Sequence, residues 1–296
     1  MNKYVVNSFE EYVNIITKIG NENNSKWFRG QSKCEYRLTP SAFRKMYAIE
    51  DWKGIKIDSP FEDNPCSGSN NKVAILPIDI MVKKFREKTN SLLEYDVDNK
   101  IEWECIAQHY GIPTRLLDWS TNALVALYFA VEDCKIESTN EYDIDEFMEF
   151  GFSGGGGAVF VIDPLEINKM CVPNEEFADN PIIFNTSEYG EFLETLLDEA
   201  FPPICFYGFN KEKRIARQAG NFTLFGKLMW PMDYYQVIQE KITKIFIPYE
   251  AYDEIREMLG ALGYTQKTIY VEKDKKELLA EKIAKKTYNE FISEFS

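Results

Sequence analysis

Polar residues that can do chemistry are concentrated in residues 108–122, directly before the most apolar stretch of the chain. His109, the only histidine, lies in this segment. An imidazole titrates near neutral pH, so it can act as a general acid or base or stack on a nucleobase. We therefore predict a catalytic role for His109. The alternative is a histidine at a helix end that is hydrogen-bonded to the backbone.

Arg29 lies in the segment Trp-Phe-Arg-Gly-Gln, which has the pattern of a short strand ending beside a glycine. A guanidinium can hold a phosphate through two parallel hydrogen bonds, and Gly30 permits close approach of the backbone. We predict that Arg29 and Gln31 bind a ligand. The alternative is a structural ion pair between Arg29 and a carboxylate such as Asp118.

Arg115 and Asp118 are predicted to position the same ligand, or else to form a buried pair that fixes their loop to the core. Ser120, Thr121 and Asn122 follow them and precede the apolar helix. We predict these three as ligand-binding residues as well. The alternative is that Ser120 or Asn122 is the N-cap that such a helix requires.

Arg214 and Gln218 flank a turn that ends at Gly220 and Phe222. We predict that Arg214 binds the ligand and that Gln218 acts on it, the alternative being an ordinary β-turn with Phe222 in the core. These are the places where polar residues interrupt apolar segments. The strand of Arg29, residues 108–122 and residues 214–222 are therefore expected to meet around one pocket.

The elements that must position these residues follow from caps, breakers and apolar periodicity. Helices are predicted at 8–20, 78–90, 100–110, 187–200, 249–262 and 274–295, and a short one is expected to start in 38–47. The helix after Asn122 is apolar on every side and is predicted to lie in the core. Strands are predicted at 27–31, 158–163, 242–248 and 268–271, and a loop feeds a further strand at 214–225.

Two segments resist such an assignment. Residues 51–71 are rich in Gly, Pro, Asn, Asp and Ser and are predicted to be a flexible insertion. Residues 137–157 are acidic and end in a run of four glycines, so we expect a solvated loop and a hinge before the strand at 158–163. No lysine or helix follows the glycines, so a phosphate loop is not favoured. The elements together predict one α+β domain over residues 1–296, with a mixed sheet flanked by helices and a C-terminal helix.

Composition excludes several classes of protein. The formal net charge of −14 argues against a general surface for duplex nucleic acid, which needs clustered Lys and Arg. The six cysteines form no CxxC pair, so neither a disulfide framework nor a zinc site is expected. The start of the chain has no apolar signal segment, and its longest apolar run is too short to cross a bilayer. We expect a cytoplasmic protein that contacts no membrane.

Three segments carry a resemblance to a known family: WFRGQ at 27–31, QHYGIPTRLLDWSTNALVALYFA at 108–130 and RIARQAGNFTLFG at 214–226. In order and wording they resemble the FRG domain family, which is named after the Phe-Arg-Gly motif, and the resemblance covers roughly residues 5–280. FRG-domain genes are widespread in bacteria and their viruses. The resemblance therefore implies a bacterial toxin or an antiviral effector.

The same segments are more remotely similar to ADP-ribosyltransferases of the Arg-Ser-Glu class. That resemblance implies an ADP-ribosyltransferase-like fold, NAD as cofactor, Arg29 on the diphosphate, and Ser120 and Thr121 beside the ribose. The target implied is a protein, a nucleic acid or a free nucleotide. Gly220 stands where that class has its catalytic glutamate, so a non-catalytic sensor or adaptor that binds a ligand or partner in the same cleft is the second hypothesis.

Overall fold

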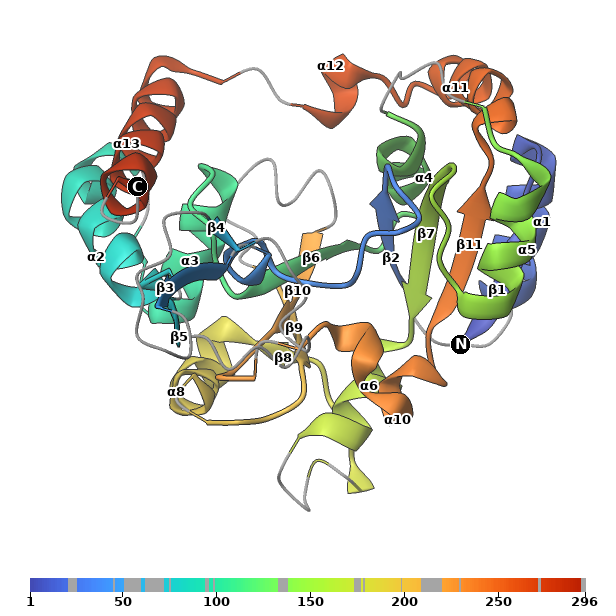
Figure 1. Cartoon of the computed structure of the whole chain (residues 1–296). Coiled ribbons are helices and arrows are strands. Elements are labelled where there is room, and N and C mark those ends of the chain that lie inside the picture. The colour runs from blue at the N-terminus through green and yellow to red at the C-terminus, as the bar shows by residue number, and fades with distance from the viewer. Residues whose placement is uncertain are drawn as a thin grey trace.

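The fold is described from a computed structural model of the whole chain (Figure 1). The structure describes residues 1–20, 26–44, 46–50, 60–61, 72–74, 76–93, 96–97, 99–132, 138–172, 177, 179–197, 199–208, 220–228, 230–270 and 273–293. For 46–50, 60–61, 72–74 and 220 it describes the backbone alone.

The strands in the described part of the chain form two sheets. Eight strands make the larger sheet: β1 (Asn2–Val5), β2 (Trp27–Gln31), β6 (Leu116–Ser120), β7 (Gly157–Ile162), β8 (Phe184–Asn185), β9 (Ile204–Tyr207), β10 (Gly220–Leu224) and β11 (Thr243–Ile247). Their order is β1-β11-β7-β2-β6-β10-β9-β8. The outer pairs β1–β11 and β8–β9 are parallel and the pairs between them are antiparallel, so the sheet is mixed.

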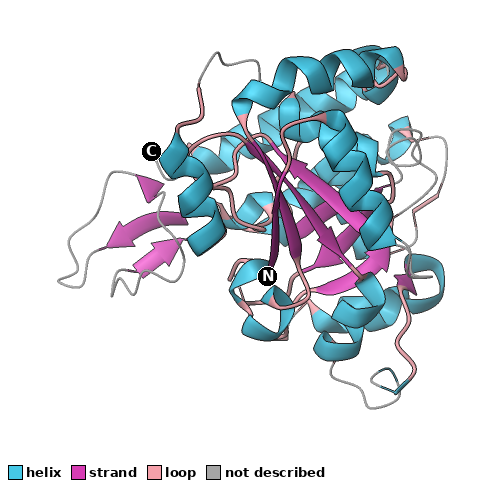
Figure 2. Ribbon diagram, turned by 90° about the vertical axis from the view of Figure 1, so that its right-hand side faces the viewer, coloured by secondary structure: helices cyan, strands magenta, loops and turns pink. Residues whose placement is uncertain are grey.

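The smaller sheet is built from β3 (Met46–Glu50), β4 (Pro60–Phe61) and β5 (Lys72–Ala74), in the order β4-β3-β5. Figure 2 shows it standing apart from the larger sheet. The insertion predicted at 51–71 thus contains a two-residue strand at 60–61, and its remaining residues lie outside the described part of the chain.

Helices flank the larger sheet. The α-helices are α1 (Phe9–Gly20), α2 (Ile78–Thr89), α3 (Lys100–His109), α4 (Ala123–Val131), α5 (Glu141–Phe150), α6 (Pro164–Cys171), α8 (Thr186–Leu196), α10 (Gln236–Gln239), α11 (Tyr252–Ala261), α12 (Gln266–Ile269) and α13 (Lys275–Ile292). Short 3₁₀ turns are η1 (Ser41–Phe43), η2 (Asn90–Leu92), η3 (Met232–Tyr234) and η4 (Tyr249–Ala251).

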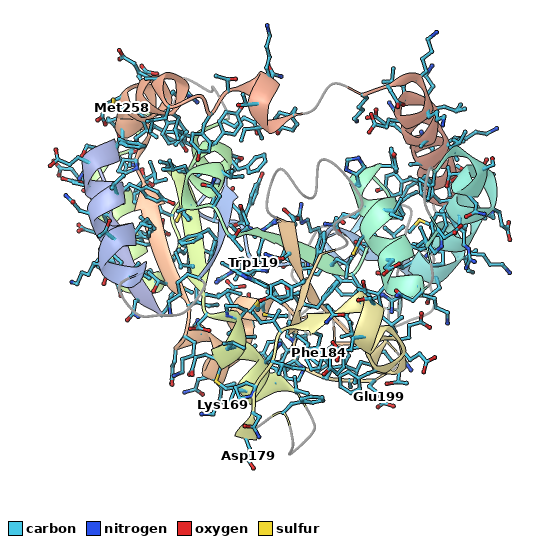
Figure 3. The ribbon with its side chains drawn as sticks, turned by 180° about the vertical axis from the view of Figure 1, so that it is seen from behind. Trp119, Lys169, Asp179, Phe184, Glu199 and Met258 are labelled. Atoms are coloured by element: carbon cyan, nitrogen blue, oxygen red, sulfur yellow. The ribbon has the colours of Figure 1, made fainter. Side chains whose placement is uncertain are left out.

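Two apolar cores separate these layers. The smaller core joins α1, α4 and α11 to one face of β2, β7 and β11, through residues such as Phe28, Leu127 and Ile255. The larger core covers the opposite face of the sheet and includes residues of β6, β8, β9 and β10. Trp119 and Phe184 belong to it, and Figure 3 shows both in the interior. The α+β class with a mixed sheet is therefore confirmed.

Close packing of α4 against the sheet depends on glycines. A Cβ on Gly30 would lie 1.8 Å from the carbonyl oxygen of Ala126, and one on Gly157 would lie 2.2 Å from that of Ala130. Gly156 adopts φ +74° and faces the carbonyl of Ile247. The last two glycines of the run, Gly156 and Gly157, thus let the backbone of β7 lie close to the backbones of β11 and α4.

A buried lysine fixes the loop that follows β2. Lys244 on β11 is 1% exposed, and its Nζ donates to the carbonyls of Cys34, at 2.7 Å, and Gly151, at 2.8 Å. Burial lowers the pKa of this ammonium and raises the pKa of the Cys34 thiol to about 11. Both hydrogen bonds compensate part of the cost of burying a cation.

Two sequence predictions about elements are wrong. Residues 266–269 form the helix α12 instead of a strand at 268–271, because Thr265 and Thr268 cap it reciprocally. The acidic segment forms helix α5, with a capping box between Asn140 and Asp143. The helix expected to start in 38–47 is the single turn η1, which follows Pro40, and strand β3 begins at Met46.

Candidate functional site

The three segments that carry the sequence resemblance become neighbouring strands. β2 holds Arg29, β6 lies within the 108–130 segment, and β10 begins at Gly220 within the 214–226 segment; their order in the sheet is β2-β6-β10. β6 and β10 pair along five residues, with Gly220 opposite Ser120. Strands distant in sequence thus lie side by side where we expect one site.

The sheet opens between β2 and β6. Among the described residues of these strands, Phe28 and Ser120 alone are paired. Beyond that pair the strands diverge, and Figure 1 shows β6 running across the view whereas β2 runs up it. Arg29 fills the opening, because its Nη1 donates to the carbonyl oxygen of Asp118 at 2.8 Å.

Arg29 also forms an ion pair with the side chain of Asp118, with Nη1 2.9 Å from Oδ2. The Arg29 side chain is 11% exposed, whereas that of Asp118 is 60% exposed. Its Nε is buried and has no hydrogen-bond partner among the described residues. The guanidinium is therefore fixed through one nitrogen, and its Nε–H faces no acceptor in the described part of the chain.

Asp118 is held from two sides. Gln108, at the end of α3, donates from Nε2 to Asp118 Oδ1 at 3.4 Å, and Gln108 itself accepts from the hydroxyl of Thr114. The surrounding protein removes solvent and acts to raise the pKa of Asp118, but the Arg29 guanidinium outweighs this and holds the pKa below its usual value. Asp118 is therefore held in its ionised form by Arg29, and 60% of its side-chain surface is exposed.

Arg44 adds a second guanidinium. It follows η1 and donates from Nε to the carbonyl of Thr39 at 3.0 Å. Hydrogen bonds between η1 and Thr114 join this turn to the loop before β6. Partial desolvation and the nearby charge of Arg29 lower the pKa of Arg44, while Asp118 opposes the shift. Arg44 and Gln108 were not predicted from the sequence, and the turn-forming pair of Pro40 and Ser41 at the start of η1 was the available signal for Arg44.

Gln31 lies on the same side of β2 as Arg29, since alternate residues of a strand share a face. It is 6% exposed, and its Nε2 donates to the carbonyl of Arg37 at 3.2 Å. Its Oε1 has no partner among the described residues. Gln31 therefore presents a buried acceptor beside the arginine.

The Ser-Thr-Asn triplet starts helix α4. Asn122 is the N-cap: its Oδ1 accepts from the amides of Leu124 and Val125, and its Nδ2 donates to the hydroxyl of Tyr264. Ser120 is buried and its Oγ accepts from the amide of Asn122, while Thr121 is exposed. Asn122 is therefore the N-cap that the alternative named, and Ser120 stabilises the same turn by accepting the hydrogen bond from the Asn122 amide.

Arg115 is not paired with Asp118. It is buried, with Nε 3.1 Å from Glu104 Oε1 and Nη2 2.9 Å from Asp79 Oδ1. The expectation of a buried Arg115–Asp118 pair is therefore wrong, because Arg115 turns toward α2 and α3 while Asp118 faces Arg29. Arg115 fixes the loop before β6 to two helices, and the structure assigns it no place beside Arg29.

His109 is the last residue of α3 and is half-buried. Its ring lies 4.7 Å from that of Tyr110 in an edge-to-face arrangement. Arg214 and Gln218 lie outside the described residues. The structure thus brings together Arg29, Gln31 and Asp118 from the prediction, with Ser120 and Asn122 at the adjoining strand end.

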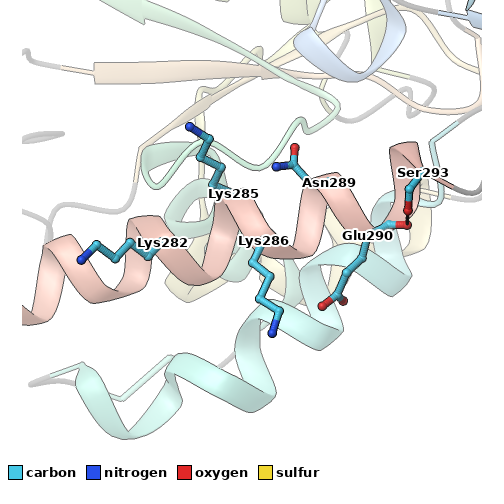
Figure 4. A pocket seen from close by; sticks show the side chains of 6 residues that line it. All are labelled: Lys282, Lys285, Lys286, Asn289, Glu290 and Ser293. Atoms are coloured by element: carbon cyan, nitrogen blue, oxygen red, sulfur yellow. Dashed lines mark hydrogen bonds between the residues drawn. The ribbon is translucent and has the colours of Figure 1, made fainter. Parts of the chain in front are cut away.

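The described residues hold no trio of His, Cys, Asp or Glu side chains suited to a metal ion. They also include no helix with the length and apolarity to cross a bilayer. A shallow cavity of about 470 Å³ lies elsewhere, on α13, where Lys282, Lys285, Lys286, Asn289, Glu290 and Ser293 line it (Figure 4). It shares no residue with the three neighbouring strands.

A family model matches part of the chain. Residues 24–139 match the family model of the FRG domain, and this range contains β2, α3, β6 and α4. No curated protein and no solved structure matches the chain. The matched range includes Arg29, Arg44, Gln108 and Asp118.

Proposed function

We propose that the FRG domain of this chain binds a phosphate-bearing nucleotide, with NAD as the ligand, between β2 and β6. The observation that carries the proposal is the state of Arg29. Asp118 engages its Nη1, and its buried Nε has no partner in the described part of the chain. A buried donor without an acceptor costs about 1–3 kcal/mol, and an anion at this position would remove that cost.

Charge supports an anion at this place. The charges of Arg29 and Arg44 both act on the carboxylate of Asp118, which leaves one positive charge uncompensated among these three groups. Arginine presents a planar fork that binds a phosphate through two parallel hydrogen bonds. Because Asp118 holds one end of the guanidinium, Arg29 loses little freedom when a phosphate binds.

The neighbouring positions of β2, β6 and β10 support an ADP-ribosyltransferase-like reading of the resemblance. In that reading Arg29 holds the diphosphate of NAD, Ser120 and Thr121 lie beside the ribose, and Gln31, Asn122 and Arg214 complete the binding residues. His109 or Gln218 acts on the sugar. The biological setting that the resemblance implies is that of a bacterial toxin or antiviral effector, acting on a protein, a nucleic acid or a free nucleotide.

A second candidate is a sensor or adaptor that binds the nucleotide without cleaving it. Gly220 favours it, because the residue opposite Ser120 has no side chain and so offers no charge to the ligand. Both candidates share the same binding site and differ in whether nicotinamide is released.

Thermal melts with and without NAD test the binding site. Arg29→Ala and Arg29→Lys should both lose the stabilisation by NAD, because lysine keeps the charge but lacks the fork. Both should melt near the wild-type temperature without ligand, because Asp118 remains solvated. Arg86→Ala, which removes an exposed arginine of α2, is the control and should keep its response to NAD.

Assay of nicotinamide separates the two candidates in the same samples. Its release supports the transferase-like enzyme, and tight binding without release supports the sensor. A wild-type protein whose melting temperature is unchanged by NAD overturns the proposal. If both Arg29 variants instead respond to NAD as the wild type does, the assignment of this arginine is wrong.

A further inference from the structure

Asp118 is the one exposed residue of β6, whose other four residues are buried. We propose that its carboxylate supplies the negative charge that acts on the sugar of the bound nucleotide, in place of a side chain at position 220. The inference rests on the proposed function and names the acting group within the same site.

The pairing of β6 and β10 puts Asp118 on the same face of the sheet that a side chain at position 220 would occupy. Gly220 lies opposite Ser120, and Phe222 lies opposite Asp118. Residues opposite each other in an antiparallel pair share a face, and so do residues two apart on one strand. A side chain at 220 would therefore project from the same face as Asp118, about 7 Å further along the strands.

The carboxylate is also held in place before a ligand arrives. Oδ2 lies 2.9 Å from Arg29 Nη1, and Oδ1 accepts from Gln108 Nε2 at 3.4 Å. The backbone carbonyl of the same residue is bonded to the same nitrogen of Arg29. Fixed charges that need no rearrangement during the reaction are the more effective in stabilising a transition state.

A negative group beside a phosphate site requires compensation. Arg29 and Arg44 supply two positive charges around Asp118, so a bound phosphate and the carboxylate can be present together. One arginine then serves two purposes: Nη1 orients the carboxylate, while Nε remains available to the phosphate. The Asp118 carboxylate and the proposed phosphate site are thus both in contact with the side chain of Arg29.

The chemistry needs a carboxylate of this kind. When the bond between the ribose C1′ and the pyridine nitrogen of nicotinamide breaks, its electron pair leaves with nicotinamide and C1′ becomes cationic. An adjacent anion stabilises that charge, as carboxylates do for the oxocarbenium-like transition states of glycoside cleavage. A hydroxyl oxygen of water, or of an acceptor, then bonds to C1′ and releases its proton to solvent. With water the products are ADP-ribose, nicotinamide and one proton.

Neutralising the carboxylate without changing its shape tests the proposal. Asp118→Asn in the full chain should lower the rate of nicotinamide release by ~100-fold or more. Its Kd for NAD should stay within about threefold, because Arg29 and Arg44 remain. Asp253→Asn, at a fully exposed aspartate of α11, is the matched control and should retain the wild-type rate.

A second variant asks whether charge on this face is what matters. Gly220→Glu in the Asp118→Asn background should recover part of the rate, since it restores a carboxylate on the same face. Asp118→Glu serves if that double variant does not fold, and it should retain more activity than Asp118→Asn. Recovery of this kind is not expected if Asp118 only supports the fold.

The outcomes distinguish the two proposals. If the wild type fails to bind NAD, the proposed function itself is wrong. If it cleaves NAD and Asp118→Asn does so equally well, binding and cleavage stand and the role of Asp118 is wrong. Loss of NAD binding in Asp118→Asn also overturns the inference, because the residue then acts by positioning Arg29. So does a wild type that binds NAD without cleaving it.

Discussion

Arg29 and Arg115 show how the same residue type takes different roles at the scale of single side chains. Each forms an ion pair near 3 Å with a carboxylate of a nearby element. The partner of Arg29 is 60% exposed, whereas Glu104, the partner of Arg115, is 2% exposed. Loss of the partner therefore leaves Arg29 beside water but leaves Arg115 buried with one exposed carboxylate, Asp79.

The two partners should differ in their effect on stability. Glu104→Ala is expected to lower the free energy of unfolding by ~3–5 kcal/mol, because it removes the buried partner of Arg115 and leaves only the exposed carboxylate of Asp79 beside it. Asp118→Ala should lower it by about 1 kcal/mol or less, since a pair whose carboxylate is 60% exposed is screened by water and contributes little. Denaturant unfolding of both variants is the measurement. A larger loss in Asp118→Ala than in Glu104→Ala would contradict this assignment.

Glu104 should also give the protein a pH-dependent stability. Burial raises the pKa of this carboxyl from 4.5 to about 7, and Arg115 offsets only part of the shift. The folded state then binds the proton more tightly than the unfolded state, so stability is greatest below the unfolded pKa and falls as the pH rises from about 4.5 to about 7. The loss should be on the order of 3 kcal/mol. The melting temperature of Glu104→Gln should change less with pH across this range than that of the wild type. An equal dependence of the melting temperature on pH in both proteins would exclude Glu104 as the cause.

At the scale of elements, the contact between β2 and α4 depends on the absence of a side chain at position 30. Gly30→Ala would bring a Cβ within 1.8 Å of the Ala126 carbonyl, which belongs to the helix backbone and does not yield easily. We expect a loss of ~3 kcal/mol or more in unfolding free energy. Gly20→Ala is the control: nothing lies within 4 Å of its new Cβ, so its stability should stay equal or rise by up to ~1 kcal/mol. Equal melting temperatures for the two variants would show that α4 shifts freely.

Sequence patterns predicted the elements whose ends carry their own local signals. Helix α3 ends at His109, before Gly111 with φ +95°, and α4 begins after the Asn122 cap, as expected. The same caps mark α5 at Asn140, but the acidic composition of that segment favoured a loop. At 268–271 the β-branched residues suggested a strand, and the capping box of Thr265 and Thr268 prevailed.

The candidate site was predictable only in part. Arg29 and Asp118 could be named because they interrupt apolar segments, and their pairing was one of two alternatives. Gln108 and Arg44 join them through contacts across the fold, between α3, η1 and β6, which no spacing in the sequence encodes. Arg115 lies close to Asp118 in sequence, yet neighbouring carboxylates on α2 and α3 determine its partner.

At the scale of the whole molecule, burial controls the chemistry of the thiols. Cys34, Cys105, Cys171 and Cys205 are at most 4% exposed. Burial raises the pKa of Cys171 to about 12 and that of Cys205 well above its usual value. These thiols should resist Ellman's reagent at pH 8 in the folded protein and react in guanidinium chloride. The assay needs a Cys66→Ser, Cys134→Ser background, since those two residues lie outside the described part of the chain, and rapid labelling of the native variant would contradict the burial of the four.

In the described part of the chain, β2 and β6 share one ladder pair, so few backbone hydrogen bonds join the two halves of the large sheet, although both halves pack on one apolar core. A ligand bound between Arg29 and the end of β6 would contact both halves of the sheet and connect them. Its binding energy would then resist separation of the halves, with a gain of about 2.7 kcal/mol at a ligand concentration of 100 times Kd. Amides of β7 and β10 would exchange more slowly with deuterated solvent in its presence, although neither strand carries a residue assigned to the phosphate. Ligand binding would thus stabilise strands of the sheet that the ligand does not contact.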